Sequence, residues 1–143
     1  MADLRFLDEE YTELGQELID EDPALDDVRE SGVKVAFLRS ELEKKTRASL
    51  IYGQCEKVPD KYRWAVPFDF TVTVFAPNVE RFTLEQLKIL LLHELLHIGV
   101  EEDGNEYDFY VREHDIEDFN EIIDRYGIGW SAETNQTGKA EGT

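Results

Sequence analysis

Hydrophobic side chains in the first part of the chain recur at helical spacing. Between residues 8 and 21 they fall on one side of a helix and acidic side chains fall on the other, which predicts an amphipathic helix. Pro23 permits a second, short helical segment that ends before Gly32. The apolar positions of the first helix are Tyr11, Leu14, Leu18 and Ile19.

After Gly32 the hydrophobic positions follow a period of two. Residues 33–37, 48–55 and 68–75 each alternate between apolar and polar or small side chains, as half-buried strands do. The pattern predicts three or four antiparallel strands. It is clearest in the last segment, where Phe68, Phe70, Val72 and Val74 alternate with Asp69, Thr71 and Thr73.

The helical period returns at residue 83. Thr83 and Gln86 have the spacing of a capping box, the side-chain pattern that begins many helices. Apolar residues continue the helical period behind them, so we expect a helix that runs to Gly99. These residues are Leu84, Leu87, Leu91 and Leu95.

The last part of the chain contains three kinds of segment. Residues 99–113 show no clear period and predict an irregular loop, whereas residues 115–126 predict a last helix that stops at Gly127. Residues 131–143 lack large apolar side chains, so burial cannot offset the entropy lost on ordering. The sequence therefore predicts one α+β domain over residues 1–130, with a small, mainly antiparallel sheet, and a disordered tail over residues 131–143.

Two of the three histidines lie in the run His93-Glu94-Leu95-Leu96-His97. Residues four apart share one face of a helix and lie about 6 Å apart along its axis, so both imidazoles could reach one metal ion. Such pentapeptides also occur by chance. Here the run follows a predicted strand and lies on a capped, strongly periodic helix, which favours a metal site.

Glu94 lies one residue round the helix from His93, so its carboxylate would border a bound ion without binding it. In that position a carboxylate can accept a proton from water and transfer it to a leaving amine. Zinc is the expected ion, because it lowers the pKa of bound water from about 15.7 to about 7 and polarises a carbonyl. The motif predicts a zinc-dependent peptidase with Glu94 as general base and a peptide or protein as substrate.

A catalytic zinc site usually has three protein ligands and one open position. His114 is the candidate third ligand, because it is the only other histidine and precedes the last predicted helix. A surface histidine near a helix end is the alternative interpretation. Carboxylates could bind the ion instead, and Asp115 or Asp118 could hold a ligand imidazole in place. The competing carboxylates are Glu113, Asp115, Glu117 and Asp118.

The chain is strongly acidic, with 33 acidic and 15 basic residues and a formal net charge of −18. This balance argues against nucleic acid and anionic membranes as partners, since both require a positive surface. One acidic block, residues 101–124, surrounds His114 and favours a cation and a basic peptide. The other block, residues 1–30, is interpreted as a solvated helical face. The basic cluster of the chain, interpreted as a solvated turn, is Lys44, Lys45 and Arg47.

Cellular location is predicted from cysteine content and hydropathy. Cys55 is the single cysteine, so an internal disulfide is impossible, and its position in a predicted strand indicates an inert thiol. The chain opens without a signal segment, and no apolar run reaches the roughly 18 residues of a membrane helix. We therefore expect a cytoplasmic protein, and the sequence leaves its oligomeric state open.

Three segments together resemble the phage metallopeptidase family, whose members are small zincin-like domains from bacteriophages, prophages and bacteria. They are HELLH at residues 93–97, HDIEDF at 114–119 and YGIGW at 126–130. The resemblance implies a zincin-like fold in which the HELLH helix packs on the sheet beside N- and C-terminal helices. It also implies a phage or prophage origin, zinc ligands at His93, His97 and His114, and Glu94 as the catalytic carboxylate.

Two rival interpretations remain open. The same ligands could hold a structural ion in a non-catalytic interaction module, with Asp115 or Glu113 closing the fourth position. A peptidase acting on proteins bound to DNA could expose a basic strip from the middle of the chain, although both acidic flanks argue against it. Peptide hydrolysis would exclude the first interpretation, and salt-sensitive DNA binding would support the second.

Overall fold

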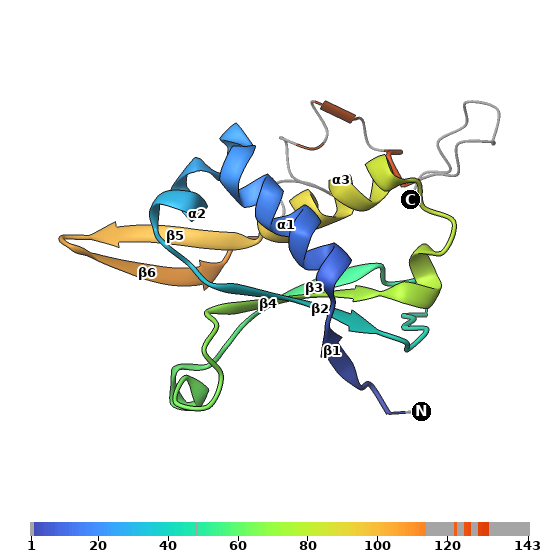
Figure 1. Cartoon of the computed structure of the whole chain (residues 1–143), viewed down its shortest axis with the longest axis horizontal. Helices are drawn as coiled ribbons and strands as arrows, with labels where there is room; N and C mark the ends of the chain where they lie inside the picture. Colours follow the sequence, from blue (N-terminus) through green and yellow to red (C-terminus); the bar gives the residue numbers. More distant parts are fainter. Residues whose placement is uncertain (1, 48, 114–121, 123–124, 127–128, 132–143) are drawn as a thin grey trace.

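The computed structural model describes residues 2–47, 49–113, 122, 125–126 and 129–131. These residues form a mixed α+β fold, in which helices lie on one face of a four-stranded sheet (Figure 1). The sheet has the order β1-β2-β4-β3. Its strands are β1 (Arg5–Leu7), β2 (Val35–Ser40), β3 (Gly53–Lys57) and β4 (Phe70–Phe75).

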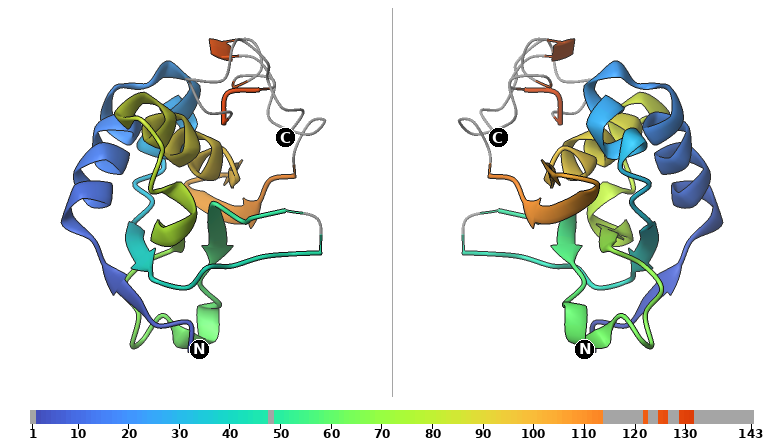
Figure 2. Two further views of the ribbon diagram at one scale, coloured as in Figure 1. Left: turned by 90° about the vertical axis from the view of Figure 1, so that its right-hand side faces the viewer. Right: turned by 90° about the vertical axis from the view of Figure 1, so that its left-hand side faces the viewer.

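Two long helices cover the sheet and lie side by side (Figure 2). The first, α1 (Glu9–Glu21), begins at Asp8, whose carboxylate accepts a hydrogen bond from the Tyr11 N–H. Gly15 lets α1 approach β2 closely, because a Cβ there would lie 2.1 Å from the Phe37 ring. The predicted helix over 8–21 is therefore confirmed, and so is the short helical segment after Pro23, which consists of η1 (Pro23–Leu25) and α2 (Asp26–Glu30).

The second long helix, α3 (Leu84–Leu95), begins as the sequence predicted. The Thr83 hydroxyl accepts from the Gln86 N–H, and the Gln86 side chain accepts from the Thr83 N–H. The helix is shorter than expected, because it ends at Leu95 rather than Gly99. Residues from Ile98 onward pair with a later strand instead of continuing the helical hydrogen bonds.

The sheet is mainly antiparallel, as expected, but one of its pairings is parallel. β1 pairs with β2 and β3 with β4 in antiparallel fashion, but β2 and β4 run parallel. Alternation of apolar and polar residues reports burial of one face and does not reveal strand direction. The strand expected over 48–55 is displaced to Gly53–Lys57, and β1, only three residues long, was not predicted.

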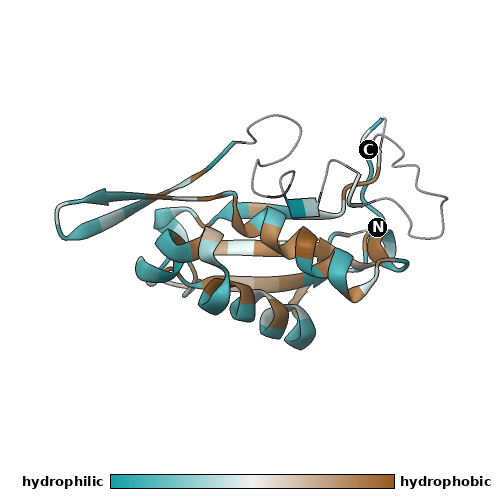
Figure 3. Ribbon diagram, turned by 90° about the horizontal axis from the view of Figure 1, so that it is seen from above, coloured by the Kyte–Doolittle hydropathy of each residue, from teal (hydrophilic) through white to brown (hydrophobic). Residues whose placement is uncertain are grey.

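The predicted loop over 99–113 is wrong, because the chain forms a hairpin there. Its strands are β5 (Ile98–Asp103) and β6 (Glu106–Val111), which form a separate two-stranded sheet. Gly104 takes a φ of 64°, which suits the first central position of a two-residue hairpin turn. The hairpin projects from the body, and hydrophilic residues predominate at its tip (Figure 3). Because few apolar residues of the hairpin are buried, the hydrophobic pattern of the sequence did not reveal its strands.

The last predicted helix and the tail fall mostly outside the described residues. Within the described part, Ile122, Arg125 and Tyr126 are helical, and Ile122 is fully buried in the core. Both terminal nitrogens of Arg125 donate to the Asp22 carboxylate, at 2.8 and 2.9 Å, which joins this segment to the end of α1. In the described part of the chain, every helix is too short or too polar to cross a membrane.

Candidate metal centre

The HELLH segment lies at the end of α3 and extends past it. His93 and Glu94 belong to the last turn of the helix, whereas His97 lies in the following turn, where its N–H donates to the Glu94 carbonyl at 3.1 Å. The two imidazole centres are 5.3 Å apart. Potential ligand atoms of His93, Glu94 and His97 all lie within 4.8 Å of one another. The early end of the helix therefore still leaves the three side chains together.

The β5–β6 hairpin fixes the orientation of His97. His97 Nδ1 lies 2.7 Å from the Arg112 carbonyl oxygen, and the Arg112 N–H donates to the His97 carbonyl at 2.6 Å. Because a carbonyl oxygen only accepts, Nδ1 must carry the hydrogen, so Nε2 is the nitrogen that could bind a metal ion. Metal-binding histidines are commonly held in this way. The hairpin, which the sequence did not predict, is thus part of the site.

Glu94 is buried between α3 and β3. Its side chain is held against Gly53, where a Cβ would lie 3.2 Å from both Cγ and Oε2 of Glu94 and 3.1 Å from the Thr73 carbonyl oxygen. A glycine at this position in the strand therefore makes room for the carboxylate. Glu94 Oε1 lies 4.0 Å from His97 Nε2, so the carboxylate borders the two imidazoles on the side of the sheet.

Cys55 lies on the same strand, two residues beyond Gly53. Burial is the main cause that raises the pKa of its thiol, and the negative charge of Glu94 raises it further. A thiol with a raised pKa stays protonated and is a poor nucleophile and metal ligand. This agrees with the inert role expected for Cys55.

β3 is an edge strand of the four-stranded sheet, and it also lies close to β6 of the hairpin. Among the described residues, β3 pairs only with β4. Tyr52 accepts from the Phe75 N–H and the Val58 N–H donates to Asp69, so alternate residues between them bond to β4. The N–H and C=O groups of Gly53, Cys55 and Lys57 consequently point away from β4. These groups could receive an extended chain beside the HELLH segment.

A row of three half-buried aromatic side chains, Tyr52, Phe82 and Trp130, leads to His93; we call it the aromatic row. The centres of the Tyr52 and Phe82 rings are 5.0 Å apart, and those of Phe82 and Trp130 are 6.3 Å apart. The Trp130 ring in turn lies 6.2 Å from the His93 imidazole. Trp130 belongs to the YGIGW segment, so the structure brings two of the three family-like segments together.

The third ligand expected from the sequence stays a prediction. His114 and the carboxylates Asp115, Glu117 and Asp118 lie outside the described residues. Glu113, the remaining alternative, is exposed and follows the Arg112 group that holds His97. In the sequence, His114 follows Arg112 by two positions, and Arg112 is the residue that bonds to His97.

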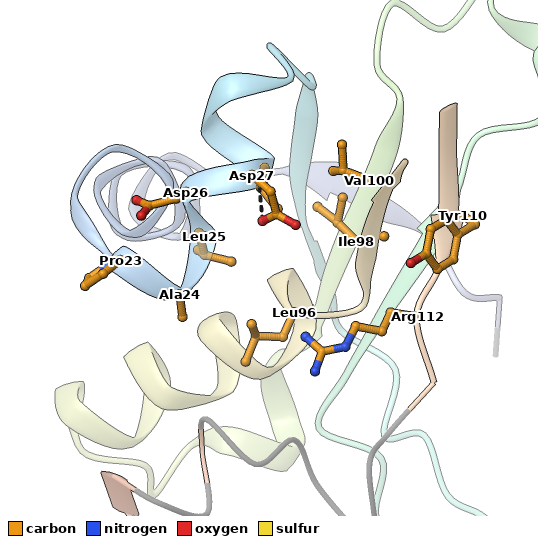
Figure 4. Close-up of a pocket in the computed structure, with 12 residues that line it drawn as sticks. Pro23, Ala24, Leu25, Asp26, Asp27, Leu96, Ile98, Val100, Tyr110 and Arg112 are labelled. Atoms are coloured by element: carbon orange, nitrogen blue, oxygen red, sulfur yellow. Dashed lines mark hydrogen bonds between the residues drawn. The ribbon is translucent and has the colours of Figure 1, made fainter. Parts of the chain in front are cut away.

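A cavity of about 440 Å³ lies beside the centre, between α2 and the root of the hairpin (Figure 4). Its lining includes Asp26, Asp27, Leu96 and the side chain of Arg112. None of His93, Glu94 and His97 lines it. Arg112 therefore contacts two places, with its backbone at His97 and its side chain at this cavity.

The described residues fit a divalent transition metal. Two imidazoles and a buried carboxylate converge, and a hydrogen bond presents the Nε2 atom of His97. Imidazole nitrogen is a preferred ligand of zinc and related ions. The site differs from a surface cluster of carboxylates in two ways. Two of its three members are imidazoles, and Glu94 is only 5% exposed.

Comparison with known families agrees with this chemistry. A family model described as Putative phage metallopeptidase matches residues 5–140, nearly the whole chain. Neither the curated proteins nor the solved structures gave a match.

Proposed function

The chain belongs to the phage metallopeptidase family, and from that membership we propose that it is a zinc-dependent peptidase. The observation that carries the proposal is the convergence of His93, Glu94 and His97 within 4.8 Å, beside a strand that pairs on one side only among the described residues. His93 and His97 would hold the ion, with His114 as the proposed third ligand. The match to a phage-related family also supports a phage or prophage origin.

Glu94 is the proposed general base. Bound zinc would supply a polarised carbonyl and a water that is acidic near neutral pH. The Glu94 carboxylate would accept the proton of the attacking water and deliver it to the leaving amine. Its contact with Gly53 holds the carboxylate between the imidazoles and the strand edge, where such a transfer requires it.

The edge of β3 away from β4 is the proposed binding site for the peptide. An extended peptide that adds a strand there would form hydrogen bonds with the backbone groups of Gly53, Cys55 and Lys57. Gly53 also contacts Glu94, so a peptide in this position passes directly beside the proposed base. Main-chain pairing of this kind gives affinity with little dependence on substrate sequence.

Glu94→Gln tests this proposal. The amide keeps the shape of the side chain but cannot accept the proton, so we expect hydrolysis to fall by at least about 100-fold. Zinc content and the unfolding midpoint should remain near those of the wild type. Glu85→Gln makes the same chemical change in the exposed first turn of α3 and should leave activity unchanged.

Three outcomes contradict the proposal. Full activity of Glu94→Gln excludes Glu94 as the base. Failure of the wild-type protein to bind zinc excludes the metal centre. A zinc-bound wild-type protein that cleaves nothing in a broad peptide library supports the structural-ion module instead.

A further inference from the structure

The aromatic row lies beside the proposed substrate edge. Tyr52 directly precedes β3, and Trp130, at the other end of the row, lies 6.2 Å from His93. The row therefore begins at the strand edge and ends at the metal-site candidate.

The position of Trp130 is fixed by its backbone as well as its ring. The Gln86 side-chain nitrogen donates to the Trp130 carbonyl at 3.3 Å, while the oxygen of the same amide accepts from the Thr83 N–H. The start of α3 thus anchors Trp130. From this anchor the ring reaches along the helix toward His93.

We propose that the aromatic row selects an aromatic or large apolar side chain next to the bond that is cut. This inference rests on the proposed peptidase function and adds its substrate class. The rings are half-buried, so a ligand side chain could cover their remaining surface. Aromatic pairs prefer edge-to-face contacts at centre distances of about 4.5–7 Å, the geometry that the row already shows between its own members.

The acidic composition of the chain makes a different prediction, namely preference for a basic substrate. The acidic residues of the hairpin strands do not belong to the row, which is entirely aromatic. Close contacts determine the preference next to the cut bond more strongly than a distant, solvent-screened field. The two preferences can therefore be separated by probes that carry no charge.

Two small hydroxamates serve as probes for the zinc-loaded full chain. Both acetohydroxamate and phenylacetohydroxamate bind zinc through the same group, and only the second carries a ring. We expect the zinc-loaded protein to bind phenylacetohydroxamate about tenfold more tightly, as one aromatic contact allows. Titration calorimetry measures both affinities without any need for catalysis.

Variants test whether Trp130 causes the tighter binding of phenylacetohydroxamate. Trp130→Ala should reduce the ratio of the two affinities to within about twofold, and Trp130→Phe should retain most of it. Trp64→Ala is the matched control, since Trp64 is 85% exposed and belongs to no part of the row. It should keep the wild-type ratio.

If Trp130→Ala no longer binds zinc, the fluorescence of Trp130 tests the aromatic preference instead. The chain has two tryptophans, so Trp64→Phe leaves Trp130 as the single emitter. Phenylacetohydroxamate should then change Trp130 emission more than acetohydroxamate does. Equal changes would overturn the proposal.

The outcomes separate this inference from the function on which it rests. Equal affinity of the wild-type protein for the two hydroxamates overturns the aromatic preference while the open metal position stands. A preference that survives Trp130→Ala also overturns it. If zinc-loaded protein binds neither probe, the open metal position is refuted, and both proposals fall.

Discussion

Gly53 offers a way to perturb Glu94 without changing it. A methyl group at residue 53 would lie 3.2 Å from Glu94 Oε2 and 3.1 Å from the Thr73 carbonyl oxygen, a few tenths of an ångström inside ordinary contact. Alanine therefore requires only a small shift. Valine adds two further methyl groups about 1.5 Å beyond Cβ, and the buried carboxylate must move by about 1 Å to make room.

A displacement of about 1 Å at a catalytic group can cost about 100-fold in rate. We therefore expect kcat to fall severalfold in Gly53→Ala and about 100-fold in Gly53→Val, with zinc content unchanged in both. Steady-state hydrolysis of a peptide substrate measures kcat, and metal analysis of the same samples measures zinc content. Because Gly53 also borders the peptide edge, KM is measured separately from kcat.

Gln54→Val is the matched control for the strand. It places the same β-branched side chain one residue away, where the alternation of the strand directs it to the opposite face of the sheet from Glu94. It should keep kcat within about twofold. Wild-type kcat in a folded Gly53→Val protein would refute the role of Glu94, and loss of zinc from that variant would show that residue 53 acts on the ion instead.

Two further predictions concern the hairpin and the ion pair between Asp22 and Arg125. Arg112→Pro removes the N–H that bonds to His97, so zinc affinity should fall about 10-fold or more, whereas Arg112→Ala keeps the backbone and should change it little; chelator competition measures both, and equal losses would contradict the backbone role. Arg125→Met should lower the free energy of unfolding by about 1 kcal/mol at pH 7. The hydrogen bonds from Arg125 lower the pKa of the Asp22 carboxyl below its ordinary value of 3.8, so this contribution is present above that value and is lost as pH falls below it. Urea titrations at pH 7 and pH 3 should show a difference between the two proteins that shrinks at the lower pH; a constant difference would contradict this origin.

The parts of the structure that the sequence predicted are those with dense, periodic burial. α1 buries one face and α3 is buried on most sides in its second half, and each begins with a side chain that satisfies a backbone N–H. The HELLH segment was visible for the same reason, since its helix was well defined. The metal-site candidates His93 and His97 could thus be brought together from sequence spacing alone, even though His97 lies beyond the helix.

The missed features leave little trace in the pattern of hydrophobic residues. β5 and β6 carry few buried residues, and the Gly104-Asn105 pair, typical of a two-residue hairpin turn, was the one local signal of their pairing. Arg112 acts on His97 through its backbone, so its side-chain type carries no information about that role. Gly53 could have been suspected, because a glycine inside a strand pattern often marks a close approach.

The central claim is that His93 and His97 hold a catalytic zinc ion with one position open. A crystal structure of the zinc-loaded protein, with anomalous differences measured at the zinc absorption edge, tests this most directly. We expect one peak within about 2.0–2.1 Å of the Nε2 atoms of both histidines, a third protein ligand and a water in the fourth position beside Glu94. Four protein ligands around the ion, or no peak at this pair of histidines, would contradict the account.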